Sequence, residues 1–447
     1  MLIAISDLHF VDQTAGANPF AGSAFDLFFE DMDWYLSRRP QVESVELLLV
    51  GDIFDLLRTN GWHQDKQGQA LPLEDRPWGQ RGLQLQKQAA QDPMQPTAGP
   101  MFSRAEAILA DIIAAAQNQL QAFTQGVARI RQRVPNTSVI YMQGNHDRLL
   151  NLHPKLRRMA RQALGMPVSD DLFPEAMAFD EYGVYATHGH QYDPYNFGGA
   201  LPDGRQDLAL VPIGDAITSE LFSRIPLEAR EQAQAMPSPL PPAEIQAMCQ
   251  GLQQMDNVRP MIAVPQWLHS QAQGLPQFQE PIAKAVQKVF KEFNDIPFVK
   301  AWSAQGGHPL AIKVFFECLE HFNFSIISRL LETLSGLLKD YAAKDPRPQA
   351  AAEIAAQYPA DAKYVLMGHT HEPKQSALAV SGPILGLQKP QVYLNTGTWR
   401  PRQHQCLEHG DFIQWKDLTY VVVYKKNERD GGNALPVFDT WTGKLYS

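Results

Sequence analysis

Five short apolar segments of this chain each end in residues that bind metals well, and this recurrence constrains the fold more than any other feature. The runs LIAIS, VELLLV, VIYM, GVYAT and KYVLM lead into DLH, GDIFD, GNHD, HGH and GHTH. Six of the thirteen histidines fall in these five motifs, which random scatter would not produce. Short runs rich in Val, Ile, Leu and Tyr are typical of strands buried on both faces of a sheet. We therefore expect five strands with polar residues at their carboxyl ends.

Helical periodicity separates the early strands. It covers residues 24–38 and 103–132, and further strand candidates lie at 391–395, at 418–426 and in the segment PVFDTW. Strands that alternate with helices predict an α/β fold, in which ligands gather beyond the carboxyl ends of the strands. All five motifs are expected at that edge, so their side chains should form one site.

Two long insertions interrupt this alternation. The first, about 58–132, begins with a stretch rich in Gln, Pro and Gly that leads into a helix. The second, 195–360, is mainly helical, because apolar stripes recur in it at helical spacing: Ile282, Val286, Val289 and Phe293, then Ile327, Leu330, Leu331, Leu334 and Leu338. We expect a core of residues 1–194 and 361–447. The second insertion either packs on it as a helical subdomain or caps the substrate pocket.

Composition narrows the choice of partner and compartment. The chain has 447 residues and a net charge of -9, which argues against a protein that coats nucleic acid. Its three cysteines are far apart and lack zinc-site spacing, as expected in a reducing compartment. We find no signal-like N-terminal segment and no apolar run of the roughly 18 residues that span a membrane. A cytoplasmic protein is expected, and no feature specifies its oligomeric state.

The motifs supply the ligand types that water-activating divalent cations prefer, namely carboxylate, amide and imidazole groups. Seven such groups exceed what one catalytic ion can use. Two ions that share a carboxylate would use all seven, and such a pair clamps the attacking and leaving oxygens of a phosphoryl displacement. The candidate ligands are Asp7, His9, Asp52, Asn145, His188, His369 and His371.

In this order, the five motifs resemble the signature blocks of the calcineurin-like metallophosphoesterase superfamily. They extend from residue 7 to residue 371 and leave both insertions unmatched. The resemblance implies an α/β fold, a four-layer αββα sandwich of two mixed sheets flanked by helices, with a binuclear metal site at one edge. It also implies an enzyme that hydrolyses a phosphomonoester, phosphodiester or pyrophosphate bond with a metal-bridging hydroxide. The implied ions are two divalent metals, manganese or iron, with zinc as an alternative.

The resemblance also assigns roles to the ligands. It places Asp7, His9 and His371 on the first ion and Asn145, His188 and His369 on the second, with Asp52 bridging both. In the HGH motif it favours His188 as the ligand. His190 is then a hydrogen-bond donor behind the ligands or a contact to the substrate.

Other residues of the motifs are candidates for catalysis and substrate binding. The resemblance gives His146 the task of protonating or stabilising the leaving oxygen, with Asp55 as its orienting partner and Asp147 as the alternative. Asp55 could instead cap a helix N-terminus. Arg148 could hold a phosphate oxygen, or belong with the basic run after it to a solvated helix face. The stretch NTGTWRPRQH could bring four side chains to the pocket rim: Trp399, Arg400, Arg402 and His404.

Two alternatives to a general phosphoesterase remain open. The GDIFDLL segment and the helical insertion resemble the branch of the UDP-2,3-diacylglucosamine hydrolases, which cleave a nucleotide-sugar-lipid pyrophosphate, although this insertion is much longer. A non-catalytic metal-binding scaffold of the same fold is the other, but it should have lost at least one ligand, and none is missing. A small phosphorylated substrate is the expected partner.

Overall fold

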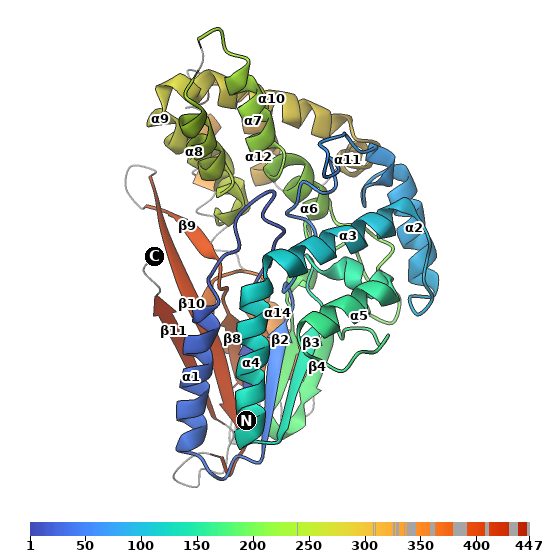
Figure 1. The fold of residues 1–447 in the computed structure, drawn as a ribbon, viewed down its shortest axis with the longest axis vertical. Helices are drawn as coiled ribbons and strands as arrows, with labels where there is room; N and C mark the ends of the chain where they lie inside the picture. The colour runs from blue at the N-terminus through green and yellow to red at the C-terminus, as the bar shows by residue number, and fades with distance from the viewer. Residues whose placement is uncertain are drawn as a thin grey trace.

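The computed structural model describes residues 1–238, 240–306, 308, 310–324, 327, 330–334, 336–337, 346–357, 363–378, 391–406, 411–428 and 437–444. The strands form two mixed sheets (Figure 1). The first sheet has the order β11-β10-β1-β2-β3, and β9 pairs with residues 412–416 of β10. Its strands are β1 (Leu2–Ile5), β2 (Ser44–Val50), β3 (Asn136–Met142), β9 (Pro401–Gln405), β10 (Phe412–Tyr424) and β11 (Val437–Lys444). The three strands β1, β2 and β3 are parallel, so their carboxyl ends share one edge.

The second sheet has the order β4-β5-β6-β8-β7. Within it, β5, β6 and β8 are parallel, and the outer strands β4 and β7 are antiparallel to their neighbours. Its strands are β4 (Ala176–Phe179), β5 (Val184–Thr187), β6 (Tyr364–Met367), β7 (Pro373–Leu378) and β8 (Gln391–Thr396).

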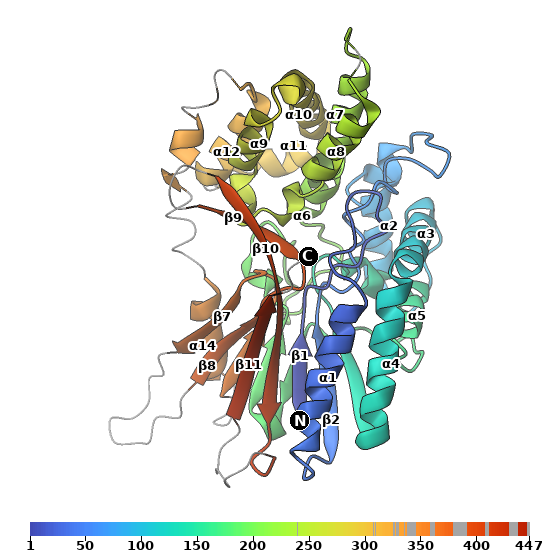
Figure 2. The same ribbon diagram turned by 60° about the vertical axis from the view of Figure 1, so that its left-hand side comes forward.

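Alternating side chains along the strands explain how the layers stack. In β1, Leu2 and Ala4 join the apolar core shared with the second sheet, whereas Ile3 and Ile5 join the core that holds the flanking helices. The helices α1 (Ser23–Ser37) and α4 (Gln117–Arg133) cover that outer face. On the far side, α14 (Arg347–Gln357) packs on β6 and β8 (Figure 2). The expected four-layer αββα sandwich is therefore confirmed.

The helix expected at 103–132 is two helices, α3 (Pro100–Ala115) and α4, with the break at Ala116. The break has a packing reason, because α3 lies on α5 (Pro154–Ala163) while α4 lies on α1. A further helix, α2 (Gln80–Gln91), lies within the first insertion, in the part that was expected to be a loop leading into a helix.

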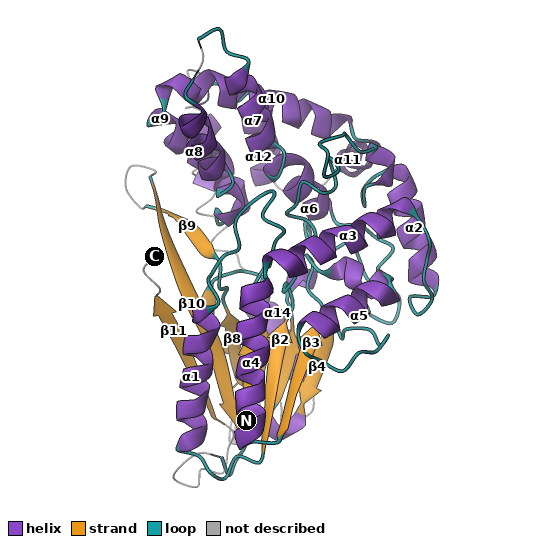
Figure 3. Cartoon of the chain, in the orientation of Figure 1, coloured by secondary structure: helices purple, strands orange, loops and turns teal. Residues whose placement is uncertain are grey.

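The second insertion forms a helical layer beyond the carboxyl ends of the strands (Figures 1 and 3). The stripe on α10 is buried as expected, as are Ile327, Leu331 and Leu334 of the second stripe, whereas Leu338 lies outside the described residues. A π-helical turn at Ile217–Phe222 follows α6. The helices are α6 (Ile213–Ala216), α7 (Ile225–Gln234), α8 (Pro242–Leu252), α9 (Val264–Gln273), α10 (Gln279–Asp295), α11 (Pro297–Ala304) and α12 (Leu310–Glu320).

The boundary between core and insertion differs from the expected one at residue 360. Helix α14 lies inside the stretch assigned to the insertion, yet it forms the fourth layer of the core through Ala351, Ile354 and Ala355. Conversely, β9 reaches up to the insertion, where Gln403 forms a β-bridge with Val258. The second insertion is thus paired directly with a strand of the core through this β-bridge. Among the described residues, we find no helix that combines the length and apolar character of a membrane span.

Candidate metal centre

The candidate ligands converge from both sheets onto one edge of the sandwich. Asp7, Asp52 and Asn145 follow β1, β2 and β3, while His188 follows β5 and the two histidines of GHTH follow β6. The histidines and aspartates among them, together with Asp55 and His146, form three groups in which all potential ligand atoms lie within 4.8 Å of one another. The groups are Asp7, His9, Asp52 and His371; Asp52, His188 and His369; and His9, Asp55 and His146.

The backbone is strained at the ligand positions. Six non-glycine residues of the described chain have positive φ, and five of them are candidate ligands; the sixth is Gln13. The five are Asp7 (53°), His9 (48°), Asp52 (55°), His369 (69°) and His371 (61°). Such conformations cost about 1–3 kcal/mol each and persist where the surrounding structure imposes them. The convergence of these side chains is thus built into the backbone.

Two glycines let neighbouring loops approach the carboxylates closely. A Cβ at Gly144 would lie 2.1 Å from Oδ1 of Asp52, and one at Gly368 would lie 2.5 Å from Oδ2 of Asp7. Neither position has room for a side chain. The glycine that precedes Asn145 in GNHD and the one that precedes His369 in GHTH therefore set the distance between loops.

In the first half of the cluster, hydrogen bonds aim the imidazoles inward. Nδ1 of His9 lies 2.9 Å from Oδ2 of Asp55, which leaves Nε2 facing the centre. That Nε2 atom is 3.0 Å from Nε2 of His371 and 3.7 Å from carboxylate oxygens of both Asp7 and Asp52. Nε2 of His371 is also 3.2 Å from Oδ1 of Asp7. Two imidazoles and two carboxylates thus face one point.

The second half has the same organisation. Nδ1 of His188 donates to the carbonyl oxygen of Val50 over 2.7 Å, so Nε2 faces Oδ2 of Asp52 at 3.2 Å. His369 presents Nδ1 to Oδ1 of Asn145 at 3.1 Å, while its Nε2 lies 3.1 Å from Oδ2 of Asp193. A carboxylate behind an imidazole fixes the tautomer and makes the inner nitrogen a better ligand.

Three buried atoms at the centre lie close to one another or to His371 without forming a well-aligned hydrogen bond: Oδ1 of Asp7, Oδ2 of Asp52 and Nε2 of His188. Burial opposes ionisation of Asp7, but the neighbouring imidazoles of His371 and His9 hold its pKa well below the usual range. Burial likewise opposes ionisation of Asp52, and positive charge on His188 and His146 lowers its pKa. Unpartnered buried carboxylate oxygens are costly unless a cation binds them. The residues therefore fit a metal site.

His146 and Asp55 lie beside this centre. Nδ1 of His146 is 2.8 Å from Oδ1 of Asp55, so the expected contact between them is present. Despite burial, the charges of Asp55 and Asp52 raise the pKa of His146 to about 10. Asp55 also accepts the backbone N–H groups of Leu57 and Arg58, but no helix begins there, so it holds a loop and is not a helix cap.

Asp147, the alternative candidate for orienting His146, has a different role in the structure. Its carboxylate accepts the backbone N–H groups of Ile53 and Gly144 at 3.0 and 2.6 Å and the hydroxyl of Tyr141 at 2.5 Å. Burial and the charge of Asp52 raise its pKa to about 6. Asp147 therefore braces the GNHD loop against the end of β2, and the structure shows Asp55 as the carboxylate in contact with His146.

Both Nη atoms of Arg148 are hydrogen-bonded inside the protein. They donate to Asp215, to Gln86 and to the carbonyl oxygen of Leu208, and the side chain is buried. These contacts connect the turn at Arg148–Leu152 to α2 and α6, and they argue against both a phosphate contact and a solvated helix face. His190 is in none of the three ligand groups and contacts Gln206, which favours His188 as the ligand.

Of the four side chains expected at the rim, Trp399 is in the apolar core, where it packs on Phe20 and Phe25. That expectation was wrong, because the indole N–H finds an acceptor at Thr419 inside the sheet. Arg402 pairs with Asp417, and the His404 ring stacks on Trp415, 3.6 Å between centroids. Arg400 alone lies beside the cluster, 3.9 Å from Oδ2 of Asp55.

The sequence analysis missed several residues at the site. Asp193 lies just past HGH, and its contact to His369 joins segments 176 residues apart. Arg259 lies in the insertion, and its Nη2 is 3.1 Å from Nδ1 of His371. No periodicity or spacing marks either residue, because loops that reach a site from another layer carry no repeating pattern. Asp193, two residues before the second insertion, offered the one signal of position, whereas Arg259 lies inside that insertion.

Comparison with models of protein families and with curated proteins gives no match for this chain. The chemistry proposed for the site therefore rests on the five motifs and on the geometry of these residues.

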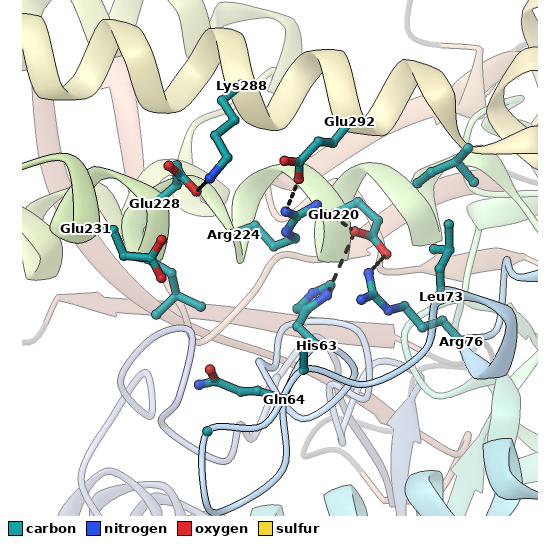
Figure 4. A pocket seen from close by; sticks show the side chains of 14 residues that line it. His63, Gln64, Leu73, Arg76, Glu220, Arg224, Glu228, Glu231, Lys288 and Glu292 are labelled. Carbon is teal, nitrogen blue, oxygen red and sulfur yellow. Dashed lines mark hydrogen bonds and ion pairs between the residues drawn. The ribbon is translucent and has the colours of Figure 1, made fainter.

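A pocket of about 450 Å³ lies elsewhere, between the 63–76 segment and the helices α7 and α10 (Figure 4). Its floor is Glu220 on the π-helical turn, which is fully buried and accepts from Arg76 and Trp78 at 2.6 Å each. Arg224 and His63 also face this carboxylate, at 3.2 and 3.8 Å. Glu220 thus fastens the first insertion to the second.

Proposed function

We propose that this protein is a binuclear metal-dependent phosphoesterase. The proposal is supported by two overlapping groups of buried ligands that share Asp52, as a pair of ions with a common carboxylate requires. When bound, two divalent ions supply an activated water and neutralise charge on the phosphoryl oxygens. Manganese or iron fits the mixed imidazole, amide and carboxylate set, with zinc as the alternative.

The chain's own residues have distinct tasks in this proposal. Asp7, His9 and His371 hold one ion, and Asn145, His188 and His369 hold the other. His146 carries a proton on its outer nitrogen and delivers it to the leaving oxygen, while Asp55 fixes the ring through Nδ1. Despite burial, the charges of Asp55 and Asp52 raise the pKa of His146 when no metal is bound, which favours the protonated ring.

The observation that carries the proposal is the His146–Asp55 pair. A site that only stores metal needs its ligands and the groups behind them. It does not need a histidine paired with a buried carboxylate beside a ligand. His146 and Asp55 fall with His9 in the third group, but there Asp55 is already hydrogen-bonded to Nδ1 of both rings, and neither residue belongs to the two groups that share Asp52. The ring of His146 lies 4.7 Å from that of His9, centroid to centroid. This arrangement favours an enzyme over the scaffold alternative.

The test is turnover by the manganese-loaded protein of a panel of phosphomonoesters, phosphodiesters and pyrophosphates, including lipid-linked ones. We expect hydrolysis of at least one class, abolished by a chelator and restored by the metal. Full activity after the bound metal is shown to be gone would refute the proposal. A protein that binds two ions but hydrolyses no member of the panel would support the scaffold.

A further inference from the structure

Three arginines from different parts of the chain gather beside His371 and Asp55. Arg58 comes from the first insertion, Arg259 from the second, and Arg400 from the turn before β9. Arg58 and Arg400 are 4% and 1% exposed. Arg259, which is half-buried, places Nη2 3.1 Å from Nδ1 of His371. None of the metal-binding motifs requires such a cluster.

Asp256 is the carboxylate that serves this cluster without a role at the metal centre. It pairs with Arg400 at 2.6 Å and with Arg58 at 3.7 Å. Asp55 lies 3.9 Å from Arg400, but it already accepts from His9 and His146. Asp7 is also nearby but is a candidate metal ligand, and Arg402 is paired with Asp417. Three arginines therefore face three carboxylates, of which two are committed to the metal centre and its histidines.

Several donors of the cluster have no acceptor. Nε and Nη1 of Arg400 and Nε of Arg58 are buried without a hydrogen-bond partner. Their other nitrogens are held firmly, Arg400 by Asn257 at 2.7 Å and Arg58 by the carbonyl oxygen of Gln253 at 2.7 Å. Buried charged donors without a hydrogen bond are expensive, and a bound water or anion can supply the acceptor. The guanidinium groups are therefore fixed in place, and Nε of Arg58 and Nη1 of Arg400 face carboxylates only at 3.7 and 3.9 Å.

Nη2 of Arg259 carries two N–H groups and directs one of them to Nδ1 of His371 at 3.1 Å, which leaves the second for an anion. Nη1 of Arg259 stays anchored on the carbonyl oxygens of Asp256 and Val258 at 2.7 and 3.0 Å, so Nη2 is the group left to bind an anion. Planar guanidinium groups suit phosphate oxygens better than a lysine would.

We propose that Arg58, Arg259 and Arg400 form a binding site for a second phosphate group of the substrate, adjacent to the metal centre. The inference rests on the proposed function and narrows it, since it favours pyrophosphates and other substrates with a further phosphate over simple monoesters. Both insertions contribute one arginine each. The insertions thereby take part in selecting the substrate.

The test is calorimetric titration of the full-length, chelator-treated chain with inorganic pyrophosphate and with inorganic phosphate. Wild-type protein should bind pyrophosphate, and Arg259→Gln should weaken binding by about tenfold or more, as expected for loss of a charge-assisted hydrogen bond. Arg158→Gln changes the net charge equally but removes a surface arginine that pairs with Asp170, and it should bind like wild type. Equal binding by wild type and Arg259→Gln would overturn the proposal.

Arg400→Gln and Arg400→Lys complete the series, with thermal unfolding as the check that each variant is folded. Lysine keeps the charge but loses the planar fork, so it should restore only part of the affinity. If Arg400→Gln does not fold, the half-buried Arg259 still decides the question. No metal is present in this titration, so the result stands whether or not the protein proves to be a phosphoesterase. Absence of pyrophosphate binding by wild type at millimolar concentration would also refute the site.

Discussion

The backbone N–H of His146 donates to Oδ1 of Asp52 over 2.9 Å. The other oxygen of Asp52 faces His188, at the centre of the candidate metal site. One carboxylate therefore fixes the GNHD loop with one oxygen and serves the cluster with the other. This division suggests that neighbouring residues of the loop can be changed with different effects on metal binding and on catalysis.

We expect the purified chain to bind two divalent ions and to lose stability when they are removed. Buried carboxylates that repel one another would then lack a cation, and an ion at 100 times its dissociation constant contributes about 2.7 kcal/mol to folding. Metal analysis together with thermal unfolding in chelator and in added manganese would check this. A melting temperature that does not change with metal would contradict it.

The variants Asn145→Ala and His146→Asn should distinguish the role of a metal ligand from the role of a proton donor. The first removes the oxygen that faces His369 and should lower occupancy of one ion. The second removes no ligand in our assignment, so both ions should stay while the rate falls by roughly 10²–10⁴-fold. Metal content measured beside steady-state rates would show the difference.

The leaving group provides the control for His146. An alkyl ester needs a proton on its leaving oxygen much more than a nitrophenyl ester does, so the loss in His146→Asn should be larger for the alkyl ester. Equal loss on both esters, or loss of an ion, would exclude the role assigned to His146.

Asp193→Asn should weaken one metal site without removing a ligand. The carboxylate behind His369 orients the ring, and loss of such a partner typically costs 10–100-fold in metal affinity or activity. Asp170→Asn, which breaks a surface pair with Arg158, is the matched control and should not change metal affinity. Competition with a chelating dye would give both affinities, and identical values would show that Asp193 is dispensable.

His63 should make the stability of the protein depend on pH. Burial lowers its pKa to about 4, against about 6.5 in the unfolded chain, so the unfolded state binds the proton first as the pH falls. The contribution is present above pH 6.5 and is lost as the pH falls towards 4, by about 2 kcal/mol between pH 7 and pH 5. His63→Gln should remove that part of the loss in denaturant unfolding. If the free energy of unfolding changes between pH 7 and pH 5 by the same amount in His63→Gln as in wild type, His63 is not a buried, neutral residue.

The core strands could be predicted because strands that are buried on both faces consist of a continuous apolar run. In β2, for example, Leu47 packs in the core with the helices and its neighbour Leu48 packs in the core between the sheets. Strand β7 could not, since it lies at the edge of its sheet and reads PKQSAL. Helix α14 was assigned to the insertion because its composition is helical in either place. Only its contact with β6 and β8 reveals the layer to which it belongs.

The metal-binding residues could be predicted because each directly follows a strand, where one short motif fixes both position and chemistry. Arg148 shows the limit of that reasoning. Its place next to the motif suggested a phosphate contact, yet the partners that bind it, Asp215 and Gln86, come from segments far along the chain. Asp193 and Arg259 are the opposite case, residues without a motif that long-range folding brings to the site.

The two ligand groups draw on both sheets, Asp7 and Asp52 from the first and the histidines of GHTH from the second. Metal ions at this edge would therefore join the two sheets, which also meet through apolar contacts, hydrogen bonds and an ion pair between Lys425 and Glu181. The same ions that confer reactivity would restrain the sheets from sliding. Catalytic competence and mechanical cohesion of the fold would then be lost in a single event, the departure of the metal.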